Sequence, residues 1–150
     1  MMQVSQKARY ALRAMFELAR GYGRGPIRIS DIAEKQAIPP RFLEGILNQL
    51  RQGGLLRSVR GARGGYEMAV EPDRVTVGDM MRIIEGPIAP AVCITDENPE
   101  DCPLYGDCAF MPLWRRAAEA LSSVYDGTTF ADLVAEEEQR CQRAALTYNI

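Results

Sequence analysis

Residues 60–65 constrain the fold of this chain more than any other stretch. Their sequence, Arg-Gly-Ala-Arg-Gly-Gly, combines three glycines with two arginines. It lies between residues 55–59 and 66–70, two segments with the strand propensity of aliphatic and aromatic residues. Glycines permit the positive φ angles that a tight hairpin tip requires. The pattern therefore predicts a β-hairpin with a doubly cationic tip.

The first 36 residues predict two helices. Over residues 5–20 the apolar residues recur at intervals of three and four, with Ser5 as the N-cap. Three closely spaced glycines and a proline end this helix, and a very short strand is expected at residues 27–29. Ser30 is then expected to cap a second helix over residues 31–36.

A third helix is predicted over residues 40–52, after two prolines that separate it from the second. Its expected buried face comprises Phe42, Leu43, Ile46, Leu47 and Leu50. The outward face comprises Arg41, Glu44, Gly45, Asn48, Gln49 and Arg51. Side chains of these types match the donors and acceptors that base edges present in the major groove. Two helices joined by a tight turn and followed by a hairpin are typical of a winged helix-turn-helix.

The distribution of charge agrees with binding to double-stranded DNA. Residues 1–75 carry 13 Lys and Arg against 7 Asp and Glu, whereas residues 76–150 carry 5 against 13. A basic half supplies the attraction to phosphates, and an acidic half stays off the DNA. The arginines of the hairpin tip suit a narrow minor groove or phosphates. The residues predicted to bind DNA are Lys7, Arg41, Glu44, Asn48, Gln49, Arg60 and Arg63.

The second half of the chain predicts three more helices. Thr76 and Asp79 form a capping box at the start of one, and a strongly periodic helix is expected over residues 112–125. A further helix begins at Thr129. The apolar stripe of residues 112–125 has little chain left to pack against. We therefore expect two copies of the chain to pair through this helix as a homodimer.

These elements give a fold that is mainly α with a small β-hairpin: a winged helix-turn-helix DNA-binding domain plus a long dimerisation helix. We expect a DNA-binding region at 1–75 and a connecting helix with a cysteine loop at 76–110. The dimerisation and C-terminal helices are expected at 111–138, and a tail at 139–150.

Cys93, Cys102 and Cys108 lie within sixteen residues, in a polar segment that prolines interrupt. The chain shows neither a signal-peptide pattern nor an apolar run of membrane-spanning length, so we expect a cytoplasmic protein with no membrane association. In a reducing compartment, cysteines favour metal binding or redox chemistry over disulfides. Three thiolates on one loop predict an iron–sulfur cluster. Cys141 lies far from this loop, and we interpret it as incidental.

Three other interpretations of the cysteines stay open: a zinc site, thiol redox sensing without metal, and structural or incidental cysteines. Zinc is disfavoured because its structural sites usually take four protein ligands, often with a Cys-x-x-Cys pair. Thiol sensing is disfavoured because the acidic residues Asp96, Glu97, Glu100, Asp101 and Asp107 oppose a thiolate.

Other classes of function are less well supported. The chain has no histidine, phosphate-binding loop or nucleophile elbow, so we do not expect an enzyme. A structural interaction module would account for the long helix but not for the arginines of the hairpin tip.

These motifs together resemble the Rrf2 family of bacterial transcription regulators, and within it the iron–sulfur branch. The resemblance covers about residues 2–138. It rests on the run from Ser5 to Met15, Ile32-Ala33, Phe42-Leu43-Glu44, Arg60-Gly61-x-x-Gly64-Gly65-Tyr66, the three-cysteine loop and Leu113-Trp114.

The resemblance implies a homodimer whose long helices cross, with each loop holding a 2Fe–2S or 4Fe–4S cluster beside the partner's DNA-binding head. On the matching positions, Cys93, Cys102 and Cys108 would be the cluster ligands. Arg60 would enter the minor groove, and the face around Arg41 and Glu44 would read the major groove.

The sequence departs from the family at the expected fourth ligand. Met111 stands three residues after the last loop cysteine, where some members of the family carry a histidine. The fourth ligand is therefore open. Glu85, Asp107, a carboxylate of the partner chain, a water molecule or no ligand are the alternatives.

Overall fold

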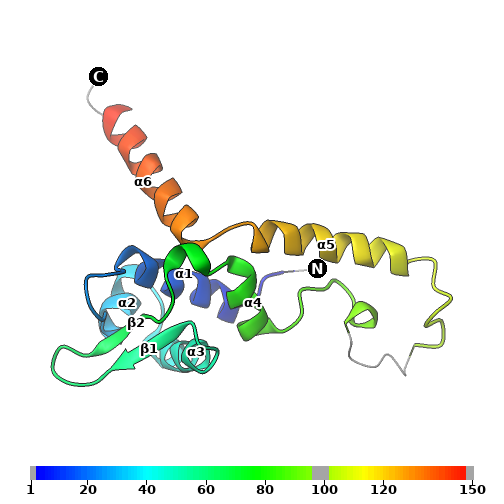
Figure 1. Ribbon diagram of the computed structural model, residues 1–150, viewed down its shortest axis with the longest axis horizontal. Helices are drawn as coiled ribbons and strands as arrows, with labels where there is room; N and C mark the ends of the chain where they lie inside the picture. Colours follow the sequence, from blue (N-terminus) through cyan, green and yellow to red (C-terminus); the bar gives the residue numbers. More distant parts are fainter. Residues whose placement is uncertain (1–2, 96–101, 148–150) are drawn as a thin grey trace.

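The computed structural model describes residues 3–95 and 102–147. Its helices are α1 (Gln6–Arg20), α2 (Ile29–Gln36), α3 (Pro40–Gln52), α4 (Val77–Glu85), α5 (Met111–Asp126) and α6 (Phe130–Thr147), with short 3-10 helices η1 (Pro72–Arg74) and η2 (Val92–Ile94). Strands β1 (Leu56–Val59) and β2 (Gly65–Met68) pair antiparallel. The predicted fold class, mainly α with a small β-hairpin, is confirmed (Figure 1).

Helix α1 lies at the centre of the compact part of the molecule, which we call the head (residues 3–85). It contacts α2, α3, α4, α6 and β2. Its buried face is rich in small residues, Ala8, Ala11 and Ala14, which let the neighbouring helices approach closely. The predicted N-cap is confirmed, because the Ser5 hydroxyl accepts a hydrogen bond from the Ala8 N–H at 3.0 Å. The head is therefore built around the first helix of the sequence.

Two local predictions in the helix-turn-helix region were wrong. Ser30 does not cap α2: the helix begins at Ile29, and its N-cap residue, Arg28, makes no side-chain capping hydrogen bond. The strand expected at residues 27–29 is reduced to one antiparallel bridge, in which Ile27 pairs with Tyr66. Because this pairing fixes the backbone of Ile27, the chain turns into helix earlier than the capping pattern indicated.

Phe42 was predicted to be buried, and this prediction was also wrong. Its side chain is 47% exposed, whereas Leu43 is fully buried. The buried stripe of α3 is made by residues at positions i, i+3, i+4 and i+7: Leu43, Ile46, Leu47 and Leu50. Phe42 precedes this stripe by one residue and therefore lies at its flank.

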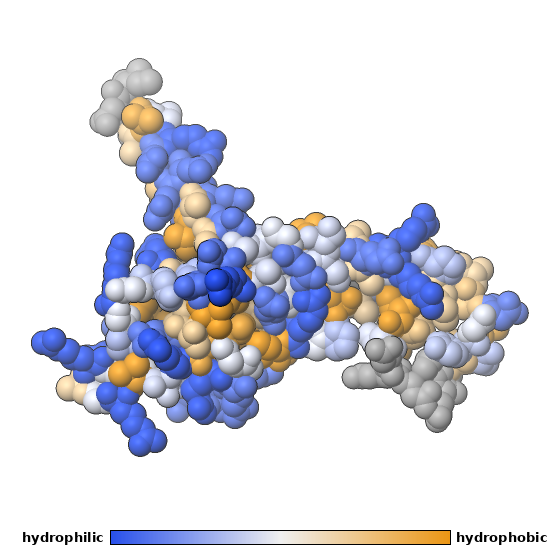
Figure 2. All heavy atoms as spheres, viewed as in Figure 1, coloured by the Kyte–Doolittle hydropathy of each residue, from blue (hydrophilic) through white to orange (hydrophobic). Residues whose placement is uncertain are grey.

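Helices α5 and α6 extend away from the head, and Figure 2 shows hydrophobic residues on the surface of the arm that α5 forms. All residues of α5 are described, and none of them is buried. Phe110, Leu113 and Val124 are 62%, 44% and 63% exposed. Helix α6 continues through Cys141 to Thr147, so most of the segment expected as a tail is helical. In the described ranges, no helix is long and apolar enough to span a bilayer.

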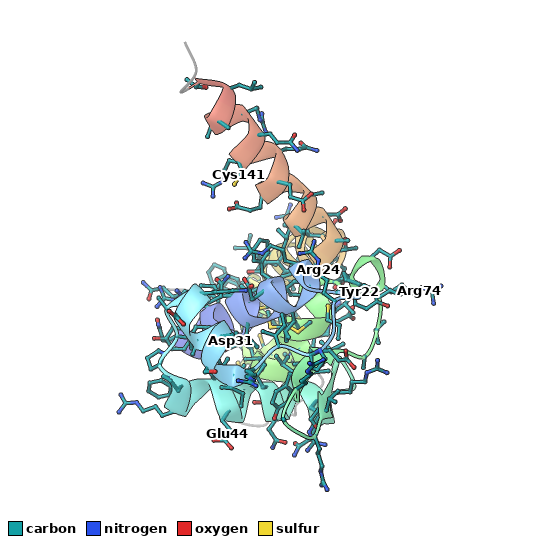
Figure 3. All side chains as sticks on the ribbon, turned by 90° about the vertical axis from the view of Figure 1, so that its left-hand side faces the viewer. Tyr22, Arg24, Asp31, Glu44, Arg74 and Cys141 are labelled. Atoms are coloured by element: carbon teal, nitrogen blue, oxygen red, sulfur yellow. The ribbon has the colours of Figure 1, made fainter. Side chains whose placement is uncertain are left out.

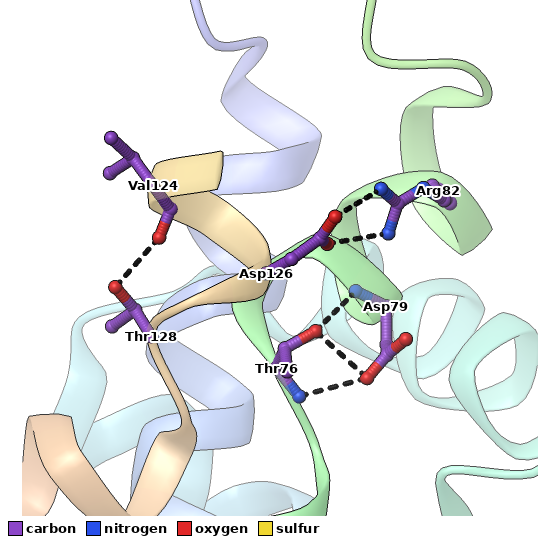
Figure 4. A network of polar contacts seen from close by, with 6 residues as sticks. All are labelled: Thr76, Asp79, Arg82, Val124, Asp126 and Thr128. Carbon is purple, nitrogen blue, oxygen red and sulfur yellow. Dashed lines mark hydrogen bonds and ion pairs between the residues drawn. The ribbon is translucent and has the colours of Figure 1, made fainter. Parts of the chain in front are cut away.

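The C-terminal end of α5 is fastened to α4 (Figure 4). Arg82 donates to both carboxylate oxygens of Asp126, each at 2.7 Å, and this hydrogen bonding lowers the pKa of Asp126 below its usual value. A Cβ at Gly78 would collide with the Asp126 carboxylate, so glycine permits this approach. The predicted capping box at Thr76 and Asp79 is confirmed beside it. One end of α5 is thus fixed to the head, and the other end leads into the cysteine loop.

Glu17 is the charged residue that the described part of the chain buries, with 3% of its side chain exposed. Its carboxylate accepts hydrogen bonds from Lys35 and Gln36, both at 3.0 Å, and pairs with Arg20 at 3.1 Å. Burial by itself would raise the pKa of Glu17. The hydrogen bonds from Lys35 and Gln36 and the charge of Arg20 outweigh burial and lower this pKa below its usual value. Glu17 therefore joins α1 to α2.

We expect Glu17→Gln to lower the free energy of unfolding by about 1–3 kcal/mol near pH 7, because it removes the buried carboxylate from three donors. Since the folded pKa is depressed, the charge of Glu17 stabilises the protein above the unfolded pKa. That contribution is lost as the pH falls through the folded pKa. The difference in free energy of unfolding between the wild type and Glu17→Gln, measured by denaturant titration, should therefore shrink below about pH 4. Glu34→Gln, on the exposed surface of α2, is the control. Equal destabilisation by both substitutions would contradict this role of Glu17.

Candidate nucleic-acid interface and cysteine loop

Helices α2 and α3 and the hairpin form a winged helix-turn-helix. Ala37 ends α2 in a left-handed conformation with φ 50°, and buried Ile38 then anchors the turn in the core. Helix α3 packs its leucine-rich stripe on α1 and leaves the opposite face to solvent. Arg41 and Glu44 are exposed on this face, and Glu44 projects away from the head in Figure 3.

The side chains of the seven residues predicted to bind DNA differ in their exposure and in their hydrogen bonds within the protein. Lys7, Arg41, Glu44, Arg60 and Arg63 are exposed, whereas Asn48 and Gln49 are half-buried. The Asn48 side-chain oxygen accepts a hydrogen bond from Arg51 at 2.8 Å. The Gln49 amide donates to the backbone carbonyl of Ile83 at 2.6 Å, which ties α3 to the last turn of α4. Contact of Gln49 with a base edge therefore competes with a contact inside the protein.

The hairpin is anchored to the start of α2. The backbone groups of Ile27 and Tyr66 exchange two hydrogen bonds, at 2.8 and 2.9 Å, and a Cβ at Gly65 would collide with the Ile27 carbonyl. At the tip, the Arg28 guanidinium donates to the Ala62 carbonyl at 2.6 Å. The sequence interpretation did not identify Arg28, because its role depends on a residue 34 positions away. These contacts anchor the hairpin that carries the exposed Arg60 and Arg63 side chains.

The cysteine loop connects α4 to the outer end of α5. Cys93 lies half-buried in η2, Cys102 is exposed, and Cys108 is half-buried just before α5. All four cysteines are free thiols. The acidic stretch at residues 96–101 lies outside the described residues. Within residues 3–95 and 102–147, no three Cys, Asp or Glu side chains are gathered as a metal site. The structure thus places the three cysteines on one connection but does not assemble their thiols.

The alternatives for a fourth ligand occupy different surroundings. Glu85 ends α4, and its carboxylate accepts a hydrogen bond from the Ser5 hydroxyl at the N-cap of α1. Asp107 is exposed within the loop, and Met111 is the first residue of α5. The donor set of three free thiols suits iron–sulfur chemistry, which uses cysteine thiolates. Glu85 is already engaged in the contact between α4 and α1.

Comparison with known proteins decides the family. Residues 4–136 match the Rrf2 family model, described as an iron-dependent transcriptional regulator. The chain belongs to the Rrf2 family. Its relatives are named as transcriptional regulators of the helix-turn-helix type, so this Rrf2 protein is a DNA-binding regulator and not an enzyme.

Relatives named CymR and IscR each match most of the chain. The regulator CymR of Bacillus subtilis is 41% identical over 132 residues, covering 88% of this chain and 89% of CymR. The regulator IscR of Aliivibrio salmonicida is 33% identical over 137 residues, covering 91% of this chain and 80% of IscR. The solved structure of B. subtilis CymR, titled the global cysteine regulator, superposes with a TM-score of 0.74 at 39% identity, covering 91% of this chain and 98% of that one. The structure of T. potens IscR superposes with a TM-score of 0.73 at 34% identity, covering 93% and 90%.

Proposed function

We propose that this Rrf2 protein is a homodimeric transcriptional regulator whose affinity for its operator is set by an iron–sulfur cluster held by Cys93, Cys102 and Cys108. The observation that carries the proposal is the position of three free cysteines on the connection between α4 and α5. This connection joins the head to the helix that carries the exposed apolar surface. The family description as iron-dependent supports iron as the metal.

The homodimer follows from the surface of α5. A helix of this length without a buried residue leaves its apolar side chains in water unless another surface covers them. A groove of about 780 Å³ between α1, the end of α5 and α6 adds Leu12, Phe16 and Leu133 to this apolar surface. A second copy of the chain supplies the matching surface, and a two-fold dimer presents two heads to paired half-sites.

The DNA-binding face combines α3 with the hairpin. Arg41 and Glu44 would meet base edges in the major groove, because they are exposed on the outward face of α3. Arg60 and Arg63, which are exposed at the hairpin tip, would meet the minor groove or the phosphates that flank it. The cytoplasm is the compartment that fits this activity.

The cysteines are placed so that a constraint on them acts on both flanking helices. When bound, a 2Fe–2S or 4Fe–4S cluster supplies a centre whose redox state and integrity respond to the surroundings. Cys93 follows α4, whose last turn contacts α3 through Ile83 and α1 through Glu85, and Cys108 precedes α5. A cluster that holds these cysteines together would therefore affect how α5 lies relative to the head. Through α5 it would affect the spacing of the two heads of the dimer. Each head must meet a half-site about one helical turn from the other, roughly 34 Å.

A cluster-free regulator that uses thiol redox chemistry, or one that binds zinc, is the second candidate. Its thiol-redox form is supported by the three free cysteines on one connection. A similar solved structure, of Staphylococcus aureus CymR, is titled as an oxidised form. In this alternative, the same loop would respond through bonds between its thiols.

We expect removal of iron with a chelator under anaerobic conditions to change the affinity for a duplex at least about tenfold, a coupling typical of allosteric regulators. The duplex is one selected from a randomised pool by the untreated protein, and binding is followed by fluorescence anisotropy. The triple variant Cys93→Ala, Cys102→Ala, Cys108→Ala should show one affinity regardless of treatment. Equal affinities of the iron-loaded and iron-depleted wild type would contradict the proposal. A change in affinity caused by thiol oxidation of iron-free protein would favour the second candidate.

A further inference from the structure

A groove of about 570 Å³ lies between the N-terminal half of α1 and the outward flank of α3. It is lined by Gln6, Lys7, Tyr10, Arg41, Phe42, Gly45, Ile46 and Gln49. Three of these residues are among those predicted to bind DNA: Lys7, Arg41 and Gln49. In the described structure, the lining carries two cations and no carboxylate, so it complements a polyanion.

Phe42 gives this groove an ordered apolar surface. Its ring centroid lies 6.1 Å from that of Tyr10, with the two planes tilted by 32°. The Arg41 guanidinium lies over the Phe42 ring, 4.7 Å from its centroid. These contacts hold the ring in place although the side chain is 47% exposed. An exposed phenyl ring is therefore fixed within a cationic surface.

Gly45 leaves the surface beside Phe42 open. It lies one turn further along the same side of α3, and a Cβ added there would meet no atom within 4 Å. A base edge can therefore approach α3 closely at this point. Because the Phe42 ring is exposed next to it, a group entering here would meet apolar carbon at that ring.

We propose that Phe42 recognises a thymine of the operator by packing its ring against the C5-methyl group, while Lys7 pairs with a flanking phosphate. The thymine methyl is the apolar group that base edges present in the major groove, and it matches an apolar side chain. The Lys7 ammonium suits a contact that positions the protein on the phosphate backbone. The inference rests on DNA binding through α3 and is independent of the cluster.

The test replaces single thymidines of the DNA by deoxyuridine. This change removes only the C5-methyl group of the base. A duplex is first selected from a randomised pool by the wild-type protein, and the thymines of one half-site are then replaced one at a time. We expect one position at which the wild type binds about fourfold more weakly, the factor that corresponds to about 0.8 kcal/mol for one buried methyl. Phe42→Ala should bind the thymine duplex more weakly and should show no further loss with deoxyuridine at that position.

Two further variants separate recognition from a general effect on the head. Phe42→Leu keeps an apolar side chain and should retain part of the sensitivity to deoxyuridine. Tyr22→Ala is the matched control, because Tyr22 is similarly exposed at 48%. Figure 3 shows Tyr22 well apart from Glu44 of α3. This variant should keep the full wild-type response.

Two results would overturn the inference. The first is a wild type that is insensitive to deoxyuridine at every thymine; if Phe42→Ala nevertheless weakens binding, Phe42 contacts the sugar–phosphate backbone. The second is a Phe42→Ala variant that keeps the full deoxyuridine penalty. If selection yields no bound duplex, DNA binding itself fails and the inference falls with it, a result that differs from the other two.

Discussion

Replacing Cys102 by alanine is expected to lower the iron and sulfide content of anaerobically purified protein at least about tenfold, with loss of its visible absorbance. Iron–sulfur clusters depend on thiolate ligands, and this loop offers three. The homodimer should persist, because the apolar surface proposed to form it lies on α5 and not in the loop. Absorbance spectra with iron and sulfide analysis test the first statement, and analytical ultracentrifugation tests the second.

Cys141→Ala is the matched control for this substitution. Cys141 is also a free, exposed cysteine, but it lies on α6, outside the loop. Figure 3 shows it on the helix that projects from the head. This variant should keep the wild-type spectrum. A Cys102→Ala protein that retained full visible absorbance would show that Cys102 is not a ligand.

Arg60→Ala should weaken binding to the selected duplex about tenfold near 0.1 M salt. It should also reduce the slope of log affinity against log salt by about one for each protomer. The reason is that Arg60 is an exposed cation at the tip of a hairpin that is anchored to α2. In the proposed complex, removing it loses a contact with the phosphates or the narrow minor groove. Anisotropy titrations over a series of salt concentrations measure both quantities.

Arg74→Ala is the control for the wing. Arg74 is 74% exposed and pairs with Glu71 in the segment after the hairpin, and Figure 3 shows it well apart from Glu44. Its removal takes away the same charge from the basic half of the chain without touching the proposed interface. If Arg60→Ala binds the duplex with wild-type affinity at every salt concentration, Arg60 is not part of the interface.

The elements that the sequence predicted well are those whose signals are local. The capping box of Thr76 and Asp79 lies within four residues, and the glycines and arginines of the hairpin tip are contiguous. The apolar stripe of α5 was also visible as a short-range repeat. In each case a few neighbouring residues carry the interactions that determine the structure, so the pattern and the fold agree.

The features that the sequence could not predict depend on distant partners. Arg82 and Asp126 are 44 positions apart, and Gln49 meets Ile83 across 34 positions. Neither pairing leaves a periodic signal. The exposure of Phe42 is a different case, because an aromatic residue at the flank of a buried stripe has the same sequence pattern as one inside it. The ring became a candidate for DNA recognition only when its surroundings were known.

For the candidate site, residue types were predictable and their arrangement was not. The sequence identified three cysteines with the chemistry of cluster ligands, but the approach of their thiols depends on how the whole loop folds. Similarly, the outward face of α3 was predicted by periodicity, whereas the hydrogen bond that engages the Gln49 amide depends on α4. The position of a residue on an element follows from the sequence more readily than the direction of its polar atoms.

The most direct test of the cluster proposal is the visible spectrum of anaerobically purified wild-type protein, together with its iron, sulfide and zinc content. The proposal predicts a coloured protein that contains iron and sulfide in similar amounts and binds the selected duplex as a dimer. A colourless, iron-free dimer that binds the duplex with full affinity and responds to thiol oxidation, or a protein with stoichiometric zinc, would contradict it.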